Sequence, residues 1–391
     1  MNTFDFYNPT RILFGEKRVA AIDEYIPGKA RVMVLYGGES ARRTGTLDEV
    51  RQALGERTVI EFGGIEANPQ FETLMRAVEK AQAEKVDFLL AVGGGSVIDG
   101  TKFVAAAIPF DGDPWSILTQ HGANVSSAMP FGTVLTLPAT GSEMNHGAVV
   151  TNAKLQAKLA FMSPHVFPKF SVLDPTKTYT LPQRQLSNGV ADAFVHIAEQ
   201  YLTVPAGTMV QDRFAEGLLR TLIELAPQII EGESDYTARA NFMWTTTWAL
   251  NGMIGAGVPQ DWASHMIGHE LTALYGIDHA RTLAIVLPSL LRERRETKGE
   301  KLLQFAEQVW DITEGDNDER IEDAIARTEA FFEGLGISTH LGDYDLGEEA
   351  IDAIVGQLES HGMTALGEQQ EITPAVSRRI LQRSLSGSRV D

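Results

Sequence analysis

Short apolar runs alternate with amphipathic segments along the first 180 residues, and this alternation restricts the possible folds more than any other feature of the sequence. Such a pattern is typical of strands and helices that form a largely parallel sheet with both faces covered. The amphipathic segment at 71–85 has helical periodicity. Strands are expected in the apolar runs at 30–38, 58–64, 86–96, 131–143 and 170–175.

Two of the expected strands lead directly into a glycine-rich turn and then into a helix. One turn contains Gly93, Gly94, Gly95 and Ser96 after the run "VDFLLAV", and the other begins at Gly37 after "VMVLY". Helix N-termini attract phosphate, and glycine lets the phosphate approach the backbone closely. Neither turn matches G-x-G-x-x-G or the P-loop pattern, so either one alone is more often only a tight turn. The pair favours nucleotide binding at the carboxyl ends of the strands.

The character of the sequence changes near residue 180, where the apolar runs give way to helical patterns joined by short turns with Gly, Pro or Asn. A chain of 391 residues is long enough for two or three domains, each with its own core. We therefore predict an α/β N-terminal dinucleotide-binding domain at 1–180 and an all-α C-terminal domain at 181–391.

The charge balance and the absence of cysteine exclude several classes of function. Lysine and arginine total 33 against 52 acidic residues, and the net charge of −19 argues against nucleic acid or an anionic membrane surface as a partner. With no cysteine, thiolate metal sites and cysteine nucleophiles are excluded. The N-terminus does not resemble a signal peptide, and no apolar run approaches the length of a membrane span. We expect a cytoplasmic protein.

Histidines are concentrated in one predicted helix and the turn after it. Three of the nine histidines, His265, His269 and His279, lie within fifteen residues. Asp192 and His196 have i, i+4 spacing on another predicted helix, so both lie on one face. Asp192, His196 and two of the three later histidines would form a shell suited to Zn²⁺ or Fe²⁺. Any one of these histidines is more often a packed core residue, but apolar helices do not need four imidazoles for packing.

Several motifs together resemble the iron-containing (group III) alcohol dehydrogenase family, and within it the bacterial NADPH-dependent aldehyde reductases and butanol dehydrogenases. The resemblance covers essentially the whole chain. It implies a dehydroquinate synthase-like fold, with the active site in the cleft between the nucleotide-binding domain and a helical metal-binding and substrate domain. The matching segments are "NPTRILFG", "GGGSVIDGTK", "TLPATGSE", "GVADAFVHIAEQY" and "GVPQDWASHMIGHELTALYGIDHARTLAIVLP".

The resemblance also implies roles for individual residues. His269 would lie beside the metal and the nicotinamide as a catalytic proton-relay residue. The metal ligands would be Asp192, His196, His265 and His279. The cofactor-binding residues would be Gly37, Gly38, Ser40, Asn68, Gly94, Gly95, Ser96, Asp99, Thr136, Ser142, Asn145 and Lys158.

The activity implied by the family is metal-dependent, reversible reduction of short- to medium-chain aldehydes to alcohols with NADP(H) and one divalent ion, Fe²⁺ or Zn²⁺. The metal would polarise the carbonyl oxygen, and the nicotinamide would deliver hydride. We expect a homodimer with a small aldehyde or alcohol substrate. Two alternatives stay open: an NAD-dependent dehydroquinate synthase-like lyase, which would need more basic residues than this acidic helical half offers, and a non-catalytic metal- or nucleotide-binding protein.

Glu39 complicates the preference for NADPH. NAD-preferring relatives carry an aspartate where this chain has Gly38, whereas NADPH-dependent relatives carry glycine where this chain has Glu39. Gly37, Gly38 and Ser40 offer donors to a 2′-phosphate, and Arg42 follows nearby. We predict NADPH, with the Glu39 side chain pointing to solvent, because a carboxylate facing the phosphate would repel it.

Overall fold

The computed structural model describes residues 1–230, 232 and 235–385, and the chain divides into two compact units. The α/β unit comprises Tyr7–Pro182 and Ser234–Thr247. The helical unit comprises Met1–Phe6, Gln183–Glu233 and Trp248–Asp391. The compact units differ from the domains predicted at 1–180 and 181–391 mainly in two short segments: Met1–Phe6 belongs to the helical unit and Ser234–Thr247 to the α/β unit. The functional division into two domains stays a prediction.

Six strands of the α/β unit form a single parallel sheet, in the order β1-β8-β5-β4-β2-β3. All five predicted strands are present, and β1 is an edge strand that the sequence analysis did not predict. The strands are β1 (Arg11–Phe14), β2 (Arg31–Tyr36), β3 (Thr58–Phe62), β4 (Phe88–Gly94), β5 (Phe131–Leu137) and β8 (Phe170–Leu173).

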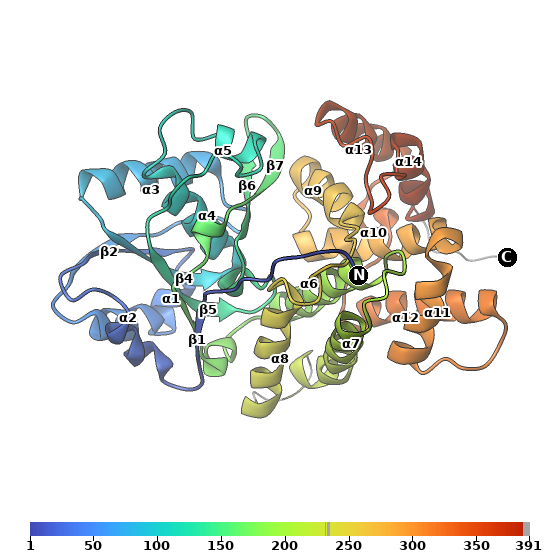
Figure 1. The fold of residues 1–391 in the computed structure, drawn as a ribbon, viewed down its shortest axis with the longest axis horizontal. Helices are drawn as coiled ribbons and strands as arrows, with labels where there is room; N and C mark the ends of the chain where they lie inside the picture. Colours follow the sequence, from blue (N-terminus) through green and yellow to red (C-terminus); the bar gives the residue numbers. More distant parts are fainter. Residues whose placement is uncertain (231, 233–234, 386–391) are drawn as a thin grey trace. The chain divides into compact units, whose positions relative to one another are not determined.

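Both faces of the sheet are buried, which explains why its strands are continuously apolar. Along β2, Met33 and Leu35 belong to the core beneath α3 (Phe71–Ala83) and α4 (Gly95–Ala107). The alternate residues Val32 and Val34 belong to the opposite core, together with α2 (Thr46–Leu54). Figure 1 shows α3 and α4 on one side of the sheet and α2 on the other. The α/β unit also contains two short helices, α1 (Ser40–Arg43) and α5 (Ser116–Thr119).

The direction in which successive strands are added to the sheet changes between β2 and β4. From β2 the chain moves outward to the edge strand β3, then crosses back to place β4 on the other side of β2. Ligands of such sheets bind at this switch point, outside the carboxyl ends of the strands. The two predicted glycine-rich turns follow β2 and β4, so both lie at the switch point.

A second, two-stranded sheet lies beside α4 and was not predicted. Its antiparallel strands are β6 (Gly147–Asn152) and β7 (Ala157–Met162), and β6 packs against α4. A short 3₁₀ helix, η2 (Ser142–Met144), precedes β6. The segment from η2 to β7 therefore brings polar residues to the helix that begins at the glycine turn.

In the helical unit, α10 is the central helix and packs against α6, α9, α12 and α14. Its residues from Thr282 to Leu291 are all buried. Among the described residues, no helix is both long and apolar enough to cross a membrane. The helices after the sheet are α6 (Gln183–Tyr201), α7 (Met209–Ile230), α8 (Tyr236–Ala249), α9 (Ala263–Tyr275), α10 (His279–Glu293), α11 (Arg295–Trp310), α12 (Asn317–Gly334), α13 (Glu348–Ser360) and α14 (Pro374–Arg383).

Candidate metal and cofactor sites

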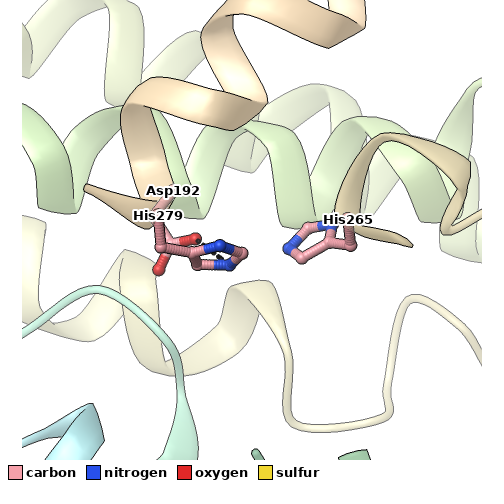
Figure 2. Close-up of side chains that lie close together, drawn as sticks. All are labelled: Asp192, His265 and His279. Carbon is pink, nitrogen blue, oxygen red and sulfur yellow. Dashed lines mark ion pairs between the residues drawn. The ribbon is translucent and has the colours of Figure 1, made fainter. Parts of the chain in front are cut away.

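Three of the predicted metal ligands come together in the helical unit. Asp192 on α6, His265 on α9 and His279 at the start of α10 each offer one ligand atom, and these atoms lie within 4.8 Å of one another. Asp192 Oδ1 is 3.8 Å from His279 Nε2. Figure 2 shows His279 beside Asp192, with the His265 ring facing them.

The other two predicted histidines pack around this cluster. The His196 ring is stacked on the His265 ring with 4.6 Å between centroids, and its Nδ1 is 3.7 Å from Asp192 Oδ1. His196 is not among the three residues whose ligand atoms all lie close together, so its role as fourth ligand stays a prediction. The His269 ring lies 5.2 Å from the His279 ring and 6.3 Å from the His265 ring, next to the cluster, and its proton-relay role stays a prediction.

The ligands converge because α10 begins against α6. Asp278, the residue before His279, accepts hydrogen bonds from Arg184 Nε at 2.8 Å and from Asn188 Nδ2 at 2.9 Å. Both donors belong to α6, the helix that carries Asp192. The start of α10 is thereby held beside the first ligand.

The chemistry of these side chains fits a divalent cation. Asp192 is 3% exposed, and within the described chain its Oδ1 has no hydrogen-bond partner. A buried carboxylate oxygen without a donor is costly unless a cation or a water compensates it. Imidazole nitrogens with one carboxylate oxygen suit Zn²⁺ or Fe²⁺.

Glu199 is a residue of this site that the sequence analysis missed. It lies on α6, three residues after His196 and seven after Asp192, a spacing that places it on the same helix face. Its carboxylate contacts His265 Nδ1. The helical spacing "DxxxHxxE" was the signal that could have identified it.

The glycine turn after β4 leaves no room for side chains at its centre. A Cβ on Gly95 would lie 2.4 Å from Thr140 Oγ1, and a Cβ on Gly94 would lie 3.0 Å from Leu137 Cβ. The backbone therefore passes close to β5 and enters α4 with its first N–H groups unpaired by the helix. This arrangement fits a phosphate at the helix N-terminus.

The turn after β2 is more open. Ser40 is the first residue of α1, and Gly38 and Ser40 are exposed. A Cβ on Gly37 would contact Val97 of α4 at 3.5 Å, which places this turn against the helix of the other glycine turn. The two predicted phosphate-binding segments are thus neighbours.

Three predicted cofactor residues are joined by a lysine that the sequence analysis did not single out. Lys102 on α4 is completely buried, and its Nζ donates to Ser142 Oγ at 2.9 Å and to Asn145 Oδ1 at 2.7 Å. Ser142 Oγ in turn donates to Asp99 Oδ1 at 2.5 Å. Burial raises the pKa of Asp99 and lowers that of Lys102 to about 8. The network holds the segment before β6 against α4.

The remaining predicted cofactor residues lie near the same end of the sheet. Lys158 Nζ on β7 donates to Asn68 Oδ1 at 3.1 Å, so these two residues are brought together. Ser96 Oγ donates to the carbonyl of Ala67, the residue before Asn68. Thr136 is the penultimate residue of β5. Contact of any of these side chains with a cofactor stays a prediction.

Glu39 is 73% exposed, in keeping with the prediction that it points to solvent. Its Oε2 lies 3.4 Å from Arg42 Nε. Arg42 also donates to Tyr36 Oη at 2.8 Å and to Glu61 Oε2 at 3.2 Å. The nearest arginine to the turn after β2 is therefore shared between two carboxylates and a phenol.

A parallel sheet with glycine-rich turns at its switch point can bind a nucleotide, and a separate buried imidazole–carboxylate cluster can hold a metal; together they are the features of a nucleotide-dependent metalloenzyme. This is the class that the fold and the two sites define.

Comparison with known proteins identifies the family. Residues 9–175 match the description "Iron-containing alcohol dehydrogenase", and residues 187–375 match "Fe-containing alcohol dehydrogenase family, C-terminal". The chain is 59% identical over 384 residues to the NADPH-dependent aldehyde reductase YqhD of Escherichia coli (strain K12), covering 98% of this chain and 99% of that protein. The chain therefore belongs to the iron-containing alcohol dehydrogenase family.

Further relatives agree with this assignment. The probable NADH-dependent butanol dehydrogenase 1 of Bacillus subtilis (strain 168) is 41% identical, covering 98% of this chain and 100% of that protein. The crystal structure of E. coli K-12 YqhD matches with a TM-score of 0.97 and 58% identity, covering 98% and 99% of the two chains. The NADH-dependent butanol dehydrogenase A of Thermotoga maritima matches with a TM-score of 0.94 and 35% identity, covering 99% of each chain.

The family and the fold class expected from the sequence are thus confirmed, and the protein is an oxidoreductase. The lyase and the non-catalytic binding protein are set aside as alternatives.

Proposed function

We propose that this protein reduces short- to medium-chain aldehydes to alcohols with NADPH, reversibly and with one divalent ion, Fe²⁺ or Zn²⁺. The observation that carries the proposal is the convergence of Asp192, His265 and His279 from three helices, with ligand atoms within 4.8 Å. The relationship to an NADPH-dependent aldehyde reductase, at 59% identity, supports the reaction and the cofactor.

Asp192, His196, His265 and His279 would hold the ion. One carboxylate and three neutral imidazoles leave a net charge of about +1 on a divalent site. Bound there, the ion would act as a Lewis acid on the carbonyl oxygen. His269, 3% exposed and beside the cluster, would pass a proton from a ring nitrogen to the product oxygen.

The α/β unit would hold the cofactor. Backbone N–H groups at Gly94, Gly95 and Ser96 would bind the pyrophosphate, and Gly37, Gly38 and Ser40 the 2′-phosphate. NADPH would supply the hydride. The residues around the Lys102 network and the Asn68–Lys158 pair would position the riboses and the nicotinamide: Asn68, Asp99, Thr136, Ser142, Asn145 and Lys158.

The experiment that tests the function is NADPH oxidation followed at 340 nm with a short aldehyde, before and after chelation. We expect turnover that disappears with chelator and returns with Fe²⁺ or Zn²⁺. Asp192→Ala should lose both metal and turnover while NADPH binding, followed by fluorescence, remains. Full metal occupancy and activity in that variant would show that the ligand assignment is wrong.

A second variant separates the proton step from metal binding. His269→Ala should keep its metal, since His269 is assigned outside the shell, and should lose about 10²-fold in kcat if it assists proton transfer. An unchanged kcat would leave His269 as a packing residue.

We further propose that the protein is a cytoplasmic homodimer. Large apolar side chains of the helical unit are exposed, a feature expected of surfaces that are covered in an assembly. Light scattering after size-exclusion chromatography measures the mass, and fractionation of cells locates the protein. The side chains concerned are Phe4, Phe6, Met209, Val210 and Phe214.

A further inference from the structure

Glu199 is buried in the helical unit at the point where α6 meets the first turn of α9. It is 2% exposed, and it shares its helix face with Asp192 and His196. A buried carboxylate in this place requires donors for both of its oxygens.

Both oxygens have partners, and both partners come from the start of α9. Oε1 accepts the backbone N–H of Ser264 at 2.6 Å, and Oε2 contacts His265 Nδ1. The backbone is joined as well, because Asp261 N–H donates to the Glu199 carbonyl at 3.0 Å. Glu199 thus orients the segment that presents His265 to the cluster.

The contact with Nδ1 decides which ring nitrogen of His265 can bind a cation. A neutral imidazole has one N–H donor and one nitrogen with a free lone pair. When Nδ1–H donates to a carboxylate, Nε2 keeps its lone pair for a metal, and the ring orientation is set at the same time.

A second ion pair holds the other side of this segment. Lys298 Nζ on α11 lies 2.8 Å from Asp261 Oδ2 and 2.8 Å from Glu368 Oε1, and all three side chains are at most 5% exposed. Asp261 Oδ1 accepts Ala263 N–H at 3.0 Å. The residues before His265 are therefore fixed to both α6 and α11, so His265 cannot easily compensate for a change at position 199.

We propose that Glu199 is a positioning residue of the metal centre, which fixes the tautomer and orientation of His265 and thereby sets the affinity for the divalent ion. The proposal rests on the metal-ligand assignment of the proposed function. General experience with metal-bound histidines is that loss of such a carboxylate weakens metal binding by about 10–100-fold.

Glu199→Gln is the decisive variant because it preserves the shape and removes one acceptor. The amide has a single oxygen, which can accept from Ser264 N–H or from His265 Nδ1–H, and its NH₂ group faces the other donor. If the NH₂ group faces His265, the ring must move its proton to Nε2 and lose the lone pair that would bind the metal.

The measurement is the dissociation constant for Zn²⁺, by competition with a chelating indicator on the purified full chain. We expect Glu199→Gln to bind Zn²⁺ about 10–100-fold more weakly than the wild type. Glu216→Gln is the matched control, because Glu216 is also buried in this unit but accepts hydrogen bonds from Tyr201 and Gln304. The Glu216→Gln variant should bind Zn²⁺ as tightly as the wild type.

Nitrogen-15 NMR of histidine-labelled, Zn²⁺-loaded wild type gives a second readout that does not depend on the variant folding. The His265 signal, assigned with His265→Ala, should show a proton on Nδ1. A proton on Nε2, or unchanged Zn²⁺ affinity in Glu199→Gln, would overturn the proposal. If Asp192→Ala also keeps its Zn²⁺, the ligand assignment itself fails; if only Glu199→Gln does, this inference alone fails.

Discussion

Lys102 and Asp99 show how strongly burial acts on individual residues of the proposed cofactor site. Lys102 is completely buried among Ser142, Asn145 and the carbonyl of Gly147, and all three acceptors lie within 2.9 Å of its Nζ. We expect Lys102→Met to lower the free energy of unfolding by roughly 3 kcal/mol, since removal of one buried partner leaves the other unpaired. Urea unfolding measures this, with the exposed Lys29→Met as a control that should change little.

The same lysine predicts a pH dependence. Burial lowers the pKa of Lys102 to about 8 from the usual 10.5, so the unfolded chain holds this proton more tightly than the folded protein does. Between pH 8 and 10.5 the unfolded state carries more protons, and stability therefore rises with pH. The free energy of unfolding, measured with urea, should therefore rise more with pH in the wild type than in Lys102→Met across this window. A flat or falling difference would contradict the burial argument.

Glu39 forms an exposed ion pair with Arg42. Its carboxylate is 3.4 Å from Arg42 Nε, so it would compete with a 2′-phosphate for the arginine and would also repel the phosphate. Because exposed ion pairs are weak, we expect Glu39→Gly and Glu39→Gln to raise the preference for NADPH over NADH by at most about fivefold. The ratio of kcat/KM for the two cofactors on one aldehyde measures this. A wild-type preference for NADH would show that the assignment of this turn to the 2′-phosphate is wrong.

At the scale of elements, the approach of α9 to α10 depends on Gly268. A Cβ at this position would lie 2.7 Å from Thr282 Oγ1 and 3.2 Å from Leu283 Cδ2. Thr282 Oγ1 is not free to move, because it donates to the carbonyl of His279 at 2.7 Å. An added methyl group therefore pushes on Thr282, whose hydroxyl is bonded to the backbone of His279.

We expect Gly268→Ala to weaken Zn²⁺ binding even though alanine is the better helix former by about 1 kcal/mol. The Zn²⁺ dissociation constant and the melting temperature, measured on the same samples, test this. The double variant Gly268→Ala, Thr282→Ala removes the blocking hydroxyl and should recover part of the affinity. Equal affinity in the wild type and in Gly268→Ala would mean that α9 and α10 adjust without moving their histidines.

For the whole molecule, the proposed metal ligands and the glycine turns belong to different compact units, so a metal ion and a cofactor should stabilise different parts of the chain. Zn²⁺ added to chelated protein should slow amide exchange in α6, α9 and α10, because a ligand stabilises the state that binds it. NADPH should slow exchange at the turns after β2 and β4. Hydrogen exchange read by mass spectrometry distinguishes the two patterns. Protection of the glycine turns by Zn²⁺ alone would contradict this assignment.

Much of the parallel sheet was predictable because its strands are buried on both faces and are therefore continuously apolar. The edge strand β1 was missed because its four residues include the exposed Arg11 and Phe14. The hairpin of β6 and β7 was missed because it lies outside the main sheet, and its exposed residues, such as Met162, interrupt the pattern.

The residue types and their spacing along helices were enough to propose a divalent metal site, because i, i+4 spacing places Asp192 and His196 on one face whatever the rest of the chain does. The spacing left open which two of the three later histidines meet Asp192. The tertiary structure brings His265 and His279 to it, from separate helices whose approach depends on packing at Gly268 and on the hydrogen bonds to Asp278. The partner of His265 was likewise decided in three dimensions. Glu199 and His265 are 66 residues apart, and no local rule of helix or strand formation relates residues at that distance.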